Sequence, residues 1–301
     1  MNFGDRLAAA VAERGSQIAL GLDPDPARLI APARQAATAT GRTAAEQAAA
    51  AVALHCRLLI EAAAPACVAV KLQLACFERL GAPGWDALAK AADAAHEQGL
   101  LVIADGKRGD VPHTAEAYAQ ALLGSTPTPW GEVPGLGADA VTANPLLGQD
   151  ALEPIVGAAR ACGGGVFVLV RTSNPGAAEI QDQPPGEAAL HRRLARLVSK
   201  LGEDGVGTSG LSDVGAVVGA TQPGLIPGLR ALMPRAVFLL PGVGAQGGEV
   251  ESLRAAFAPG RAGALVTAAR GIVDPALQEG DPAAARAAAE RLRDTAWNLQ
   301  A

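Results

Sequence analysis

The sequence predicts an α/β fold of the TIM-barrel, or (β/α)8, class in a single domain. Short apolar or β-branched runs alternate with Ala-rich amphipathic stretches, which is the pattern of repeated strand–helix units around a parallel sheet. Eight such runs occur in 301 residues. Eight strand–helix units in a chain of this length fit a closed barrel.

The expected strands are short and mostly apolar. They span Ile18–Leu22, Cys67–Leu72, Leu100–Asp105, Ala140–Ala143, Gly165–Arg171, Val214–Val218, Ala236–Pro241 and Ala264–Thr267. Helix-length segments fill most gaps, the clearest being Ala44–Ala63, Trp85–Gln98, Thr114–Leu123 and Glu187–Leu201. The Gly-rich stretches near 124–137 and 202–212 are expected to be loop insertions. No linker composition interrupts the chain, so residues 1–301 are assigned to one domain.

Composition narrows the class of protein. Half of the residues are hydrophobic, which allows a large core and argues against general disorder. Lys and Arg number 25 against 30 Asp and Glu, and aromatic residues make up 3%. A general nucleic-acid binder needs a basic surface and often aromatic platforms, so that class is excluded.

The chain is expected to work in the cytoplasm. Its four cysteines show no C-x-x-C spacing and are expected to be reduced and mostly buried. Charged residues interrupt the N-terminal apolar stretch, which argues against a signal peptide. No apolar run is expected to reach the length of a membrane span, about 18 residues.

Polar residues gather where the predicted strands end. The active site of a (β/α)8 barrel lies at the carboxyl ends of its strands, so this placement is the one that a functional site requires. The positions are Asp23, Lys71, 105–110, Asn144, 171–174, 241–248 and Arg270.

A charged cluster follows the third strand. Asp105 and Lys107 are two residues apart and therefore point the same way in an extended segment. Lys71 on the neighbouring strand can reach the same space, and Asp110 lies further along the loop. Charges buried together are costly to hold and tend to mark function. The alternative is a charged loop whose ion pairs face water.

The glycines at 242, 244 and 247 form a G-x-G-x-x-G pattern after the seventh strand. A dinucleotide-binding dehydrogenase is one interpretation, but the pattern follows the wrong strand and no suitable acid comes after it. A flexible loop that closes over one phosphate is favoured. Arg270 then supplies a cation near a helix start, although it could form a surface ion pair instead.

Three further features keep two interpretations each. Asp23 could bind a sugar hydroxyl or cap a helix starting near Pro26. The segment 173–176 could bind a polar ring edge or form a tight turn. The histidines 55, 96 and 191 are expected to be surface or packing residues, and His113 has no partner of metal-site type.

At these positions the chain closely resembles the orotidine 5'-phosphate decarboxylase family, in its longer bacterial branch. The resemblance covers nearly the whole chain in order. It is carried by GLDPDP, VKLQ, IADGKRGDVPHT, AVTANP, VRTSNPG, PGVGAQGG and AARGI. DGKRGD together with PGVGAQGG is very specific.

The resemblance implies a role for each matching residue. Lys71, Asp105, Lys107 and Asp110 match a charged catalytic array. Asp110, with Val111 and Thr114, is implied to serve the site of a partner protomer in a homodimer. The implied substrate-binding residues are Asp23 for the ribose, Ser173 for the pyrimidine, Gln246 and Arg270 for the phosphate, and Pro241 at the start of the closing loop. Asn174 stands where some relatives have His.

The implied activity is conversion of orotidine 5'-monophosphate (OMP) to uridine 5'-monophosphate (UMP) and CO2, without metal or cofactor. Fixed charges would stabilise a carbanion-like state at C6, and Lys107 would donate the proton. One alternative is a Mg²⁺-dependent sugar-phosphate decarboxylase or aldolase, which needs an acid where Lys71 stands. A non-catalytic nucleotide-binding barrel is another.

Overall fold

Eight parallel strands close into a barrel in the computed structural model, which describes residues 1–37, 43–244 and 246–299. Around the ring they are β1 (Ile18–Leu22), β2 (Ala69–Gln73), β3 (Leu101–Arg108), β6 (Ala140–Ala143), β7 (Gly165–Arg171), β8 (Val214–Val218), β9 (Phe238–Leu240) and β10 (Ala264–Ala268). Parallel pairing of β10 with β1 completes the ring. The predicted fold class is therefore confirmed.

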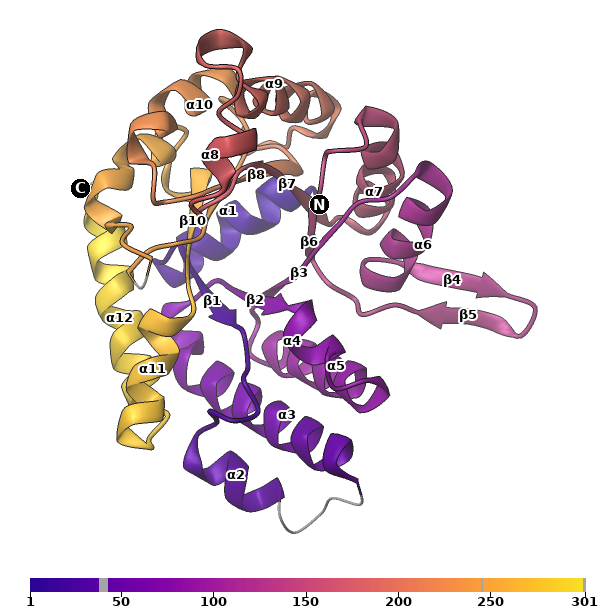
Figure 1. The fold of residues 1–301 in the computed structure, drawn as a ribbon, viewed down its shortest axis with the longest axis vertical. Coiled ribbons are helices and arrows are strands. Elements are labelled where there is room, and N and C mark those ends of the chain that lie inside the picture. The colour runs from indigo at the N-terminus through magenta and orange to yellow at the C-terminus, as the bar shows by residue number, and fades with distance from the viewer. Residues whose placement is uncertain (38–42, 245, 300–301) are drawn as a thin grey trace.

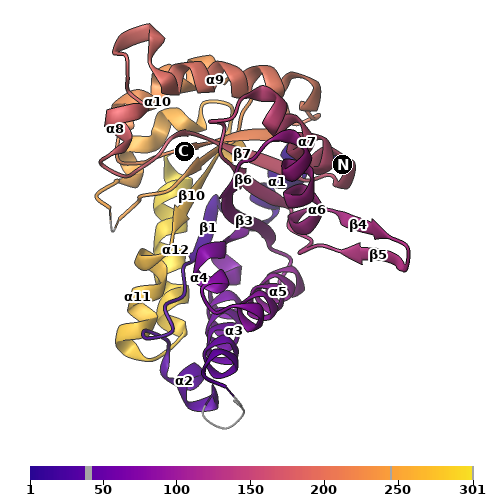
Figure 2. The same cartoon turned by 45° about the vertical axis from the view of Figure 1, so that its right-hand side comes forward.

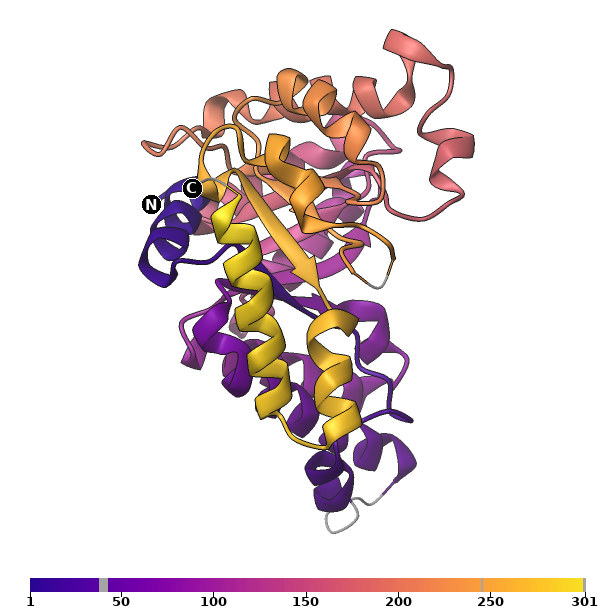
Figure 3. The ribbon, with the colours of Figure 1, turned by 90° about the vertical axis from the view of Figure 1, so that its left-hand side faces the viewer.

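Helices surround the barrel (Figure 1). They are α1 (Phe3–Arg14), α2 (Ala31–Ala37), α3 (Ala44–Ala63), α4 (Leu74–Glu78), α5 (Ala82–Glu97), α6 (Pro112–Leu122), α7 (Gln149–Cys162), α8 (Ala177–Ile180), α9 (Leu190–Leu201), α10 (Ile226–Leu232), α11 (Arg270–Glu279) and α12 (Ala283–Asn298). Short 3-10 turns are η1 (Ala64–Ala66), η2 (Gly186–Ala188), η3 (Glu203–Gly205), η4 (Pro223–Leu225), η5 (Val250–Phe257) and η6 (Arg261–Gly263). Helices α11 and α12 lie side by side along one flank (Figure 3).

The barrel has an apolar interior below the site. Inward-facing Ile103, Phe167 and Leu239 form one cluster, and α1 adds Phe3 and Leu7 to it. The ring of Phe3 meets that of Phe167 edge-on, with centroids 5.8 Å apart. Truncating a buried Phe to Ala typically costs about 3–5 kcal/mol. Helix α1 therefore closes the amino end of the barrel, which leaves the other end open for a ligand.

Helix α3 begins at a capping box and packs on the outer core. Thr43 Oγ1 accepts from the Glu46 N–H, and the Glu46 carboxylate accepts from the Thr43 N–H. With η1, α3 forms a 23-residue segment that is long and apolar enough to cross a membrane. The expectation that no run reaches this length is therefore wrong. Half of its most apolar 18-residue window is buried inside the protein, and a buried core helix passes the same test, so this is weak evidence for a membrane segment.

Most strand predictions agree closely with the structure. The bounds of β1, β6, β7 and β8 match residue for residue. Strand β3 runs three residues further than predicted because its end pairs with β6, Arg108 opposite Ala143. Helices α5 and α6 begin earlier than predicted because each has a proline in its first turn, where the missing N–H costs nothing.

The segment 124–137 is not the loop that the sequence predicts. Its strands β4 (Ser125–Thr128) and β5 (Gly131–Pro134) form an antiparallel hairpin. It projects away from the barrel (Figures 1 and 2), and Trp130 at its tip is 92% exposed. The prolines around the turn hid the strand pattern, since proline is rare within strands.

The segment 202–212 contains η3 and a short antiparallel bridge. It is tied to α1, because the Asp5 carboxylate accepts from the backbone N–H groups of Thr208 (3.1 Å) and Ser209 (2.7 Å). These hydrogen bonds lower the pKa of Asp5 to about 2. The segment therefore supports the closed end of the barrel, away from the strand ends that carry the predicted site.

Cys56 and Cys67 are buried free thiols, whereas Cys76 is half-buried and Cys162 is exposed. Burial raises the pKa of Cys67 to about 12, so this thiol stays protonated. The four cysteines are free, but the expectation that they are mostly buried holds for two of them.

Candidate active site

A cavity of about 350 Å³ opens at the carboxyl ends of the barrel strands. Its walls come from the ends of β1, β2, β3, β6, β7, β8, β9 and β10, which explains why its residues are scattered along the chain. The lining residues are Asp23, Lys71, Gln73, Asp105, Lys107, Thr142, Thr172, Ser173, Asn174, Val217, Leu239, Pro241, Gly242, Val243, Gln246, Thr267, Ala269 and Arg270.

Asp105 is the centre of the charged cluster. Its Oδ2 lies 2.6 Å from Lys71 Nζ, and its Oδ1 lies 2.6 Å from Lys107 Nζ. Lys71 Nζ is also 3.6 Å from Asp23 Oδ1. The side chains of Asp105 and Lys71 are 5% and 8% exposed, so the pair at the centre of the cluster is buried and is not a surface ion pair.

The charges in the array hold one another ionised. Burial would raise the pKa of Asp105, but the Lys71 and Lys107 charges and their hydrogen bonds outweigh it and lower that pKa to about 2. Burial opposes the charge of Lys71 as well. The carboxylates of Asp105 and Asp23 outweigh this effect and raise the pKa of Lys71. The Asp105 carboxylate therefore lies between the amino groups of Lys71 and Lys107, with the Asp23 carboxylate on the far side of Lys71.

Thr142 joins the backbone and side-chain parts of the array. Its buried hydroxyl donates to Asp105 Oδ1 at 2.8 Å and accepts from the Lys107 backbone N–H at 2.9 Å. Lys107 has φ +48°, which is unusual for a residue other than glycine. The hydrogen bond from its N–H helps to stabilise this conformation.

Gln73 packs against the same cluster from β2. With its amide oriented to satisfy both ends, it donates to the Asp105 carbonyl oxygen at 2.7 Å and accepts from Lys107 Nζ at 3.3 Å. Lys107 Nζ therefore has contacts from two strands, although its side chain remains 41% exposed to the cavity.

The glycine-rich loop after β9 folds back on itself. Gly242, Gly244 and Gly247 have φ values of +101°, +71° and +89°. Gly244 N–H donates to the Gly248 carbonyl at 2.8 Å, and Gly248 N–H donates to the Gly242 carbonyl at 3.0 Å. The glycines therefore serve a tight loop beside the cavity, since other residues rarely adopt these angles. The 3-10 turn η5 follows, in place of the α-helix that a dinucleotide fingerprint requires.

Most predicted ligand-binding positions lie around this cavity. Asp23, Ser173, Pro241, Gln246 and Arg270 line it together with the charged array. Arg270 is the first residue of α11, whose N-terminus carries the backbone N–H groups suited to an anion.

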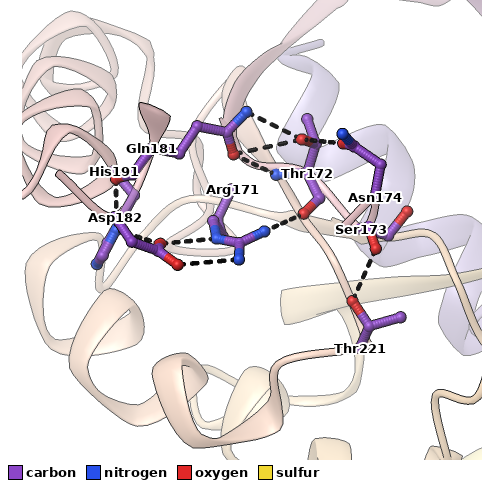
Figure 4. Close-up of polar contacts among 8 residues, drawn as sticks. All are labelled: Arg171, Thr172, Ser173, Asn174, Gln181, Asp182, His191 and Thr221. Atoms are coloured by element: carbon purple, nitrogen blue, oxygen red, sulfur yellow. Dashed lines mark hydrogen bonds and ion pairs between the residues drawn. The ribbon is translucent and has the colours of Figure 1, made fainter. Parts of the chain in front are cut away.

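Asp23 is not a helix cap, because a turn and no helix follows it. There the Asp25 carboxylate accepts from the Ala27 N–H at 3.2 Å, and α2 begins only at Ala31. Ser173 is compatible with both interpretations, and its binding to a ring edge stays a prediction. It lines the cavity, while its carbonyl accepts from Thr221 Oγ1 at 3.1 Å in a turned segment (Figure 4).

Three predicted site residues lie outside the cavity of the single chain. Asp110 Oδ1 accepts from the N–H of Val111 at 2.8 Å. Val111 is 54% exposed, and Thr114 lies in the first turn of α6. The chain by itself does not bring this group to the charged array.

Sequence reasoning missed three polar lining residues: Gln73, Thr142 and Thr267. The alternation of strand residues could have found Gln73 and Thr142, which share the inward face with Lys71 and with Ala140. Thr267 Oγ1 is buried and has no hydrogen-bond partner among the described residues. It therefore has free capacity to bind a ligand.

A larger hollow, about 1000 Å³, lies at the opposite end of the barrel beside α1. It contains two ion pairs: Arg6 contacts Asp139, and Arg160 Nε lies 2.8 Å from Asp213 Oδ2. It is also the more open of the two. We place the functional site at the carboxyl ends because the unpaired lining groups and the buried array are there.

The histidines lie away from the cavity lining. His55 is buried in α3 and accepts from the Ile30 N–H at 3.3 Å, and burial lowers its pKa to about 4. His96 contacts Asp139 at 3.1 Å. In the described residues, no group of three or more His, Cys, Asp or Glu side chains could hold a metal ion.

The chain matches one known family over most of its length. A model of the orotidine 5'-phosphate decarboxylase / HUMPS family matches residues 17–288. This chain belongs to that family. Two family relatives carry the name orotidine 5'-phosphate decarboxylase. The one from Rhodopirellula baltica is 41% identical over 276 residues, covering 91% of this chain and 88% of the relative. The one from Deinococcus radiodurans is 47% identical over 237 residues, covering 78% and 81%.

The solved structures agree. The OMP decarboxylase of Leishmania donovani superimposes with a TM-score of 0.74 at 31% identity, covering 100% of this chain and 99% of that one. The family's decarboxylase branch therefore matches in sequence and in fold, and the sequence resemblance is confirmed.

Proposed function

We propose that this protein decarboxylates OMP to UMP and CO2, the last step of de novo UMP synthesis. The observation that carries the proposal is the Lys71–Asp105–Lys107 array in the cavity, in which Lys71 and Asp105 are buried and Lys107 faces the open space. The relatives named orotidine 5'-phosphate decarboxylase support the choice of substrate.

The proposed chemistry is electrostatic and uses no metal or cofactor. Loss of CO2 from C6 leaves an electron pair in the plane of the ring, where resonance cannot spread it. Lys107 Nζ stabilises this charge and then donates the proton to C6. Asp105 lies near the departing carboxylate, and Lys71 holds Asp105 in place. The ammonium groups are already in position before the reaction, so little reorganisation is needed.

The remaining lining residues bind the unreactive parts of the nucleotide. Asp23 binds the ribose and Ser173 the pyrimidine edge. Gln246 and Arg270 bind the phosphate under the loop that begins at Pro241. Binding of the phosphate offsets the cost of closing and drying the site.

We also propose a homodimer in which Asp110, Val111 and Thr114 enter the site of the partner subunit. Two observations support it: none of the three reaches the cavity of its own chain, and Val111 exposes an apolar side chain. A carboxylate added from the partner would give Lys107 a second counter-charge beside Asp105, as Asp23 does for Lys71. Cytoplasmic location, and the absence of nucleic-acid and membrane partners, remain predictions.

The decarboxylation assay tests the activity directly. Purified protein should remove the ultraviolet absorbance of the orotate ring, and an added chelator should leave the rate unchanged. Lys107→Ala should retain UMP binding and lose turnover. No turnover by the wild-type protein, or equal rates for wild type and Lys107→Ala, would reject the proposal. Loss of activity with chelator would favour the Mg²⁺-dependent sugar-phosphate class, and UMP binding without turnover a non-catalytic barrel.

Mixing tests the shared site. Asp105→Asn and Asp110→Asn proteins should each be inactive. After subunit exchange, half of the dimers in an equal mixture are mixed, and each of these has one intact site, so about a quarter of wild-type activity should return. If exchange is demonstrated and no activity returns, Asp110 does not act across the interface.

A further inference from the structure

The end of β7 is held by a bidentate ion pair whose two residues do not line the cavity (Figure 4). Arg171, the last residue of β7, has a side chain 4% exposed. Its Nε lies 2.8 Å from Asp182 Oδ1, and its Nη2 lies 3.0 Å from Asp182 Oδ2. Its third nitrogen, Nη1, donates to the carbonyl oxygen of Thr172 at 2.5 Å. Because a bidentate guanidinium–carboxylate pair is geometrically specific, it fixes the direction of that carbonyl.

Gln181 holds the other polar groups of Thr172. Its Oε1 accepts from the Thr172 backbone N–H at 2.8 Å, and its Nε2 donates to Thr172 Oγ1 at 2.9 Å. The Thr172 hydroxyl in turn donates to Asn174 Oδ1 at 2.7 Å. Side chains from positions 171, 181 and 182 therefore hold the N–H, the carbonyl and the hydroxyl of one residue.

His191 anchors the far side of this arrangement to α9. Its Nδ1 lies 2.8 Å from the Gln181 carbonyl oxygen and 3.1 Å from Asp182 Oδ1. The sequence predicts a surface or packing role for this histidine. The imidazole is buried and, in addition, has these two polar partners. The segment that supplies Gln181 and Asp182 is thus fixed to a long helix and is not a free loop.

The residues that are held line the cavity, whereas the residues that hold them do not. Thr172, Ser173 and Asn174 face the site, and Arg171 and Asp182 lie behind them. A buried ion pair is weak evidence for added stability, because apolar residues of similar volume often serve as well. What this pair supplies is a fixed orientation for the backbone that presents Ser173.

We propose that Arg171, Gln181 and Asp182 are positioning residues that orient the 172–174 segment and so set the affinity of the site for the pyrimidine ring. The inference rests on the proposed function, in which Ser173 contacts that ring. Phosphate binding should be independent of these residues, since Gln246 and Arg270 come from the ends of β9 and β10.

The test compares two ligands that share a ribose and a phosphate, of which only UMP carries the pyrimidine base. UMP and ribose 5-phosphate are titrated by calorimetry into wild type, Gln181→Ala and Asp182→Asn. Glu187→Gln is the matched control. Glu187 lies in the same connection and pairs with Arg192 and Arg196 on α9, but makes no contact with Thr172.

We expect Gln181→Ala and Asp182→Asn to weaken UMP binding about tenfold or more, with ribose 5-phosphate and the control unchanged. In turnover, KM for OMP should rise by a similar factor while kcat changes less than about threefold. Gln181→Ala removes no charge, so it tests the inference even if Asp182→Asn fails to fold. Equal weakening of both ligands, or no weakening of UMP, would overturn the inference. If wild type binds UMP but does not turn over OMP, the proposed activity fails while the binding comparison still decides this point.

Discussion

Replacing Asp105 by Asn should destabilise the folded protein, because two ammonium groups would lose their shared counter-charge. Removing one partner of a buried ion pair costs about 3–5 kcal/mol. The depressed pKa of Asp105 gives a second measure of this loss of stability. A fall from the model-compound value of 3.8 to about 2 corresponds to roughly 2 kcal/mol of stability near neutral pH. Asn can still accept from Lys71 or Lys107, so we expect a loss of about 3 kcal/mol at pH 7.

The expected change in melting temperature follows from chain length. Unfolding entropy is about 2.1 cal/mol/K per residue, or roughly 0.6 kcal/mol/K for this chain. A loss of about 3 kcal/mol then lowers Tm by about 5 °C. Urea unfolding and calorimetry on wild type and Asp105→Asn measure both quantities. The control is Asp86→Asn, which makes the same substitution in an exposed Asp86–Lys90 pair at 2.6 Å. An exposed helical pair contributes about 0.3–0.5 kcal/mol.

The pH dependence separates the charge effect from a packing effect. The folded-state pKa of Asp105 is depressed, so the stability from its ionised form is complete above the unfolded value near 3.8 and is lost as pH falls through about 2. The gap between wild type and Asp105→Asn should therefore narrow by about 1 kcal/mol between pH 7 and pH 3. Lys71 has a raised pKa, so its contribution is complete below 10.5 and is lost only at higher pH. Equal stability of the two proteins at pH 7, or the same gap at both pH values, would refute the reasoning.

Three further changes test other parts of the site. Thr142→Val removes the hydroxyl that links Asp105 and Lys107. Because a lost hydrogen bond to a charged group costs about 1.5–3 kcal/mol, kcat should fall at least about tenfold with KM little changed. Thr142→Ser keeps the hydroxyl and should retain most of the rate, and a low rate in this variant would point to a packing effect. Arg270→Ala should raise KM about a hundredfold or more, because a charge-assisted phosphate contact is lost. Added phosphite dianion should increase the rate of decarboxylation of orotidine, which lacks the phosphate, more for wild type than for the variant. Gly242→Ala adds a methyl group to a residue whose backbone has φ +101° and places it 3.2 Å from Thr221 Cγ2. Because residues other than glycine rarely adopt this angle, we expect a raised KM and a lower Tm. Unchanged values of both would count against a constrained loop.

The alternation of strands and helices could be predicted because each element buries one face, and the pattern of that face is local. Four strands were predicted to the residue. Asp105 and Lys107 could be assigned to one side of β3 because the side-chain period of a strand is two. The hairpin at 125–134 could not be predicted, because its strands are mostly exposed and have no apolar alternation.

The partners of each site residue were less predictable. Arg171 could be located at a strand end, but nothing local indicates that its guanidinium pairs with Asp182. Asp110 follows the end of β3, three residues after Lys107, yet it lies outside the cavity that Lys107 lines.

The sequence alone determined the barrel class, the positions of the strands and the presence of charged residues at their carboxyl ends. Those properties depend on local burial patterns and on the rule that parallel strands end at one face. Only the tertiary structure decided that Lys71, Lys107 and Thr142 meet on one carboxylate, that Lys107 adopts a positive φ, and that Gln181 and Asp182 hold the 172–174 segment. The physical reason is that contacts between residues distant in sequence depend on strand register and side-chain direction, which are set when the barrel closes.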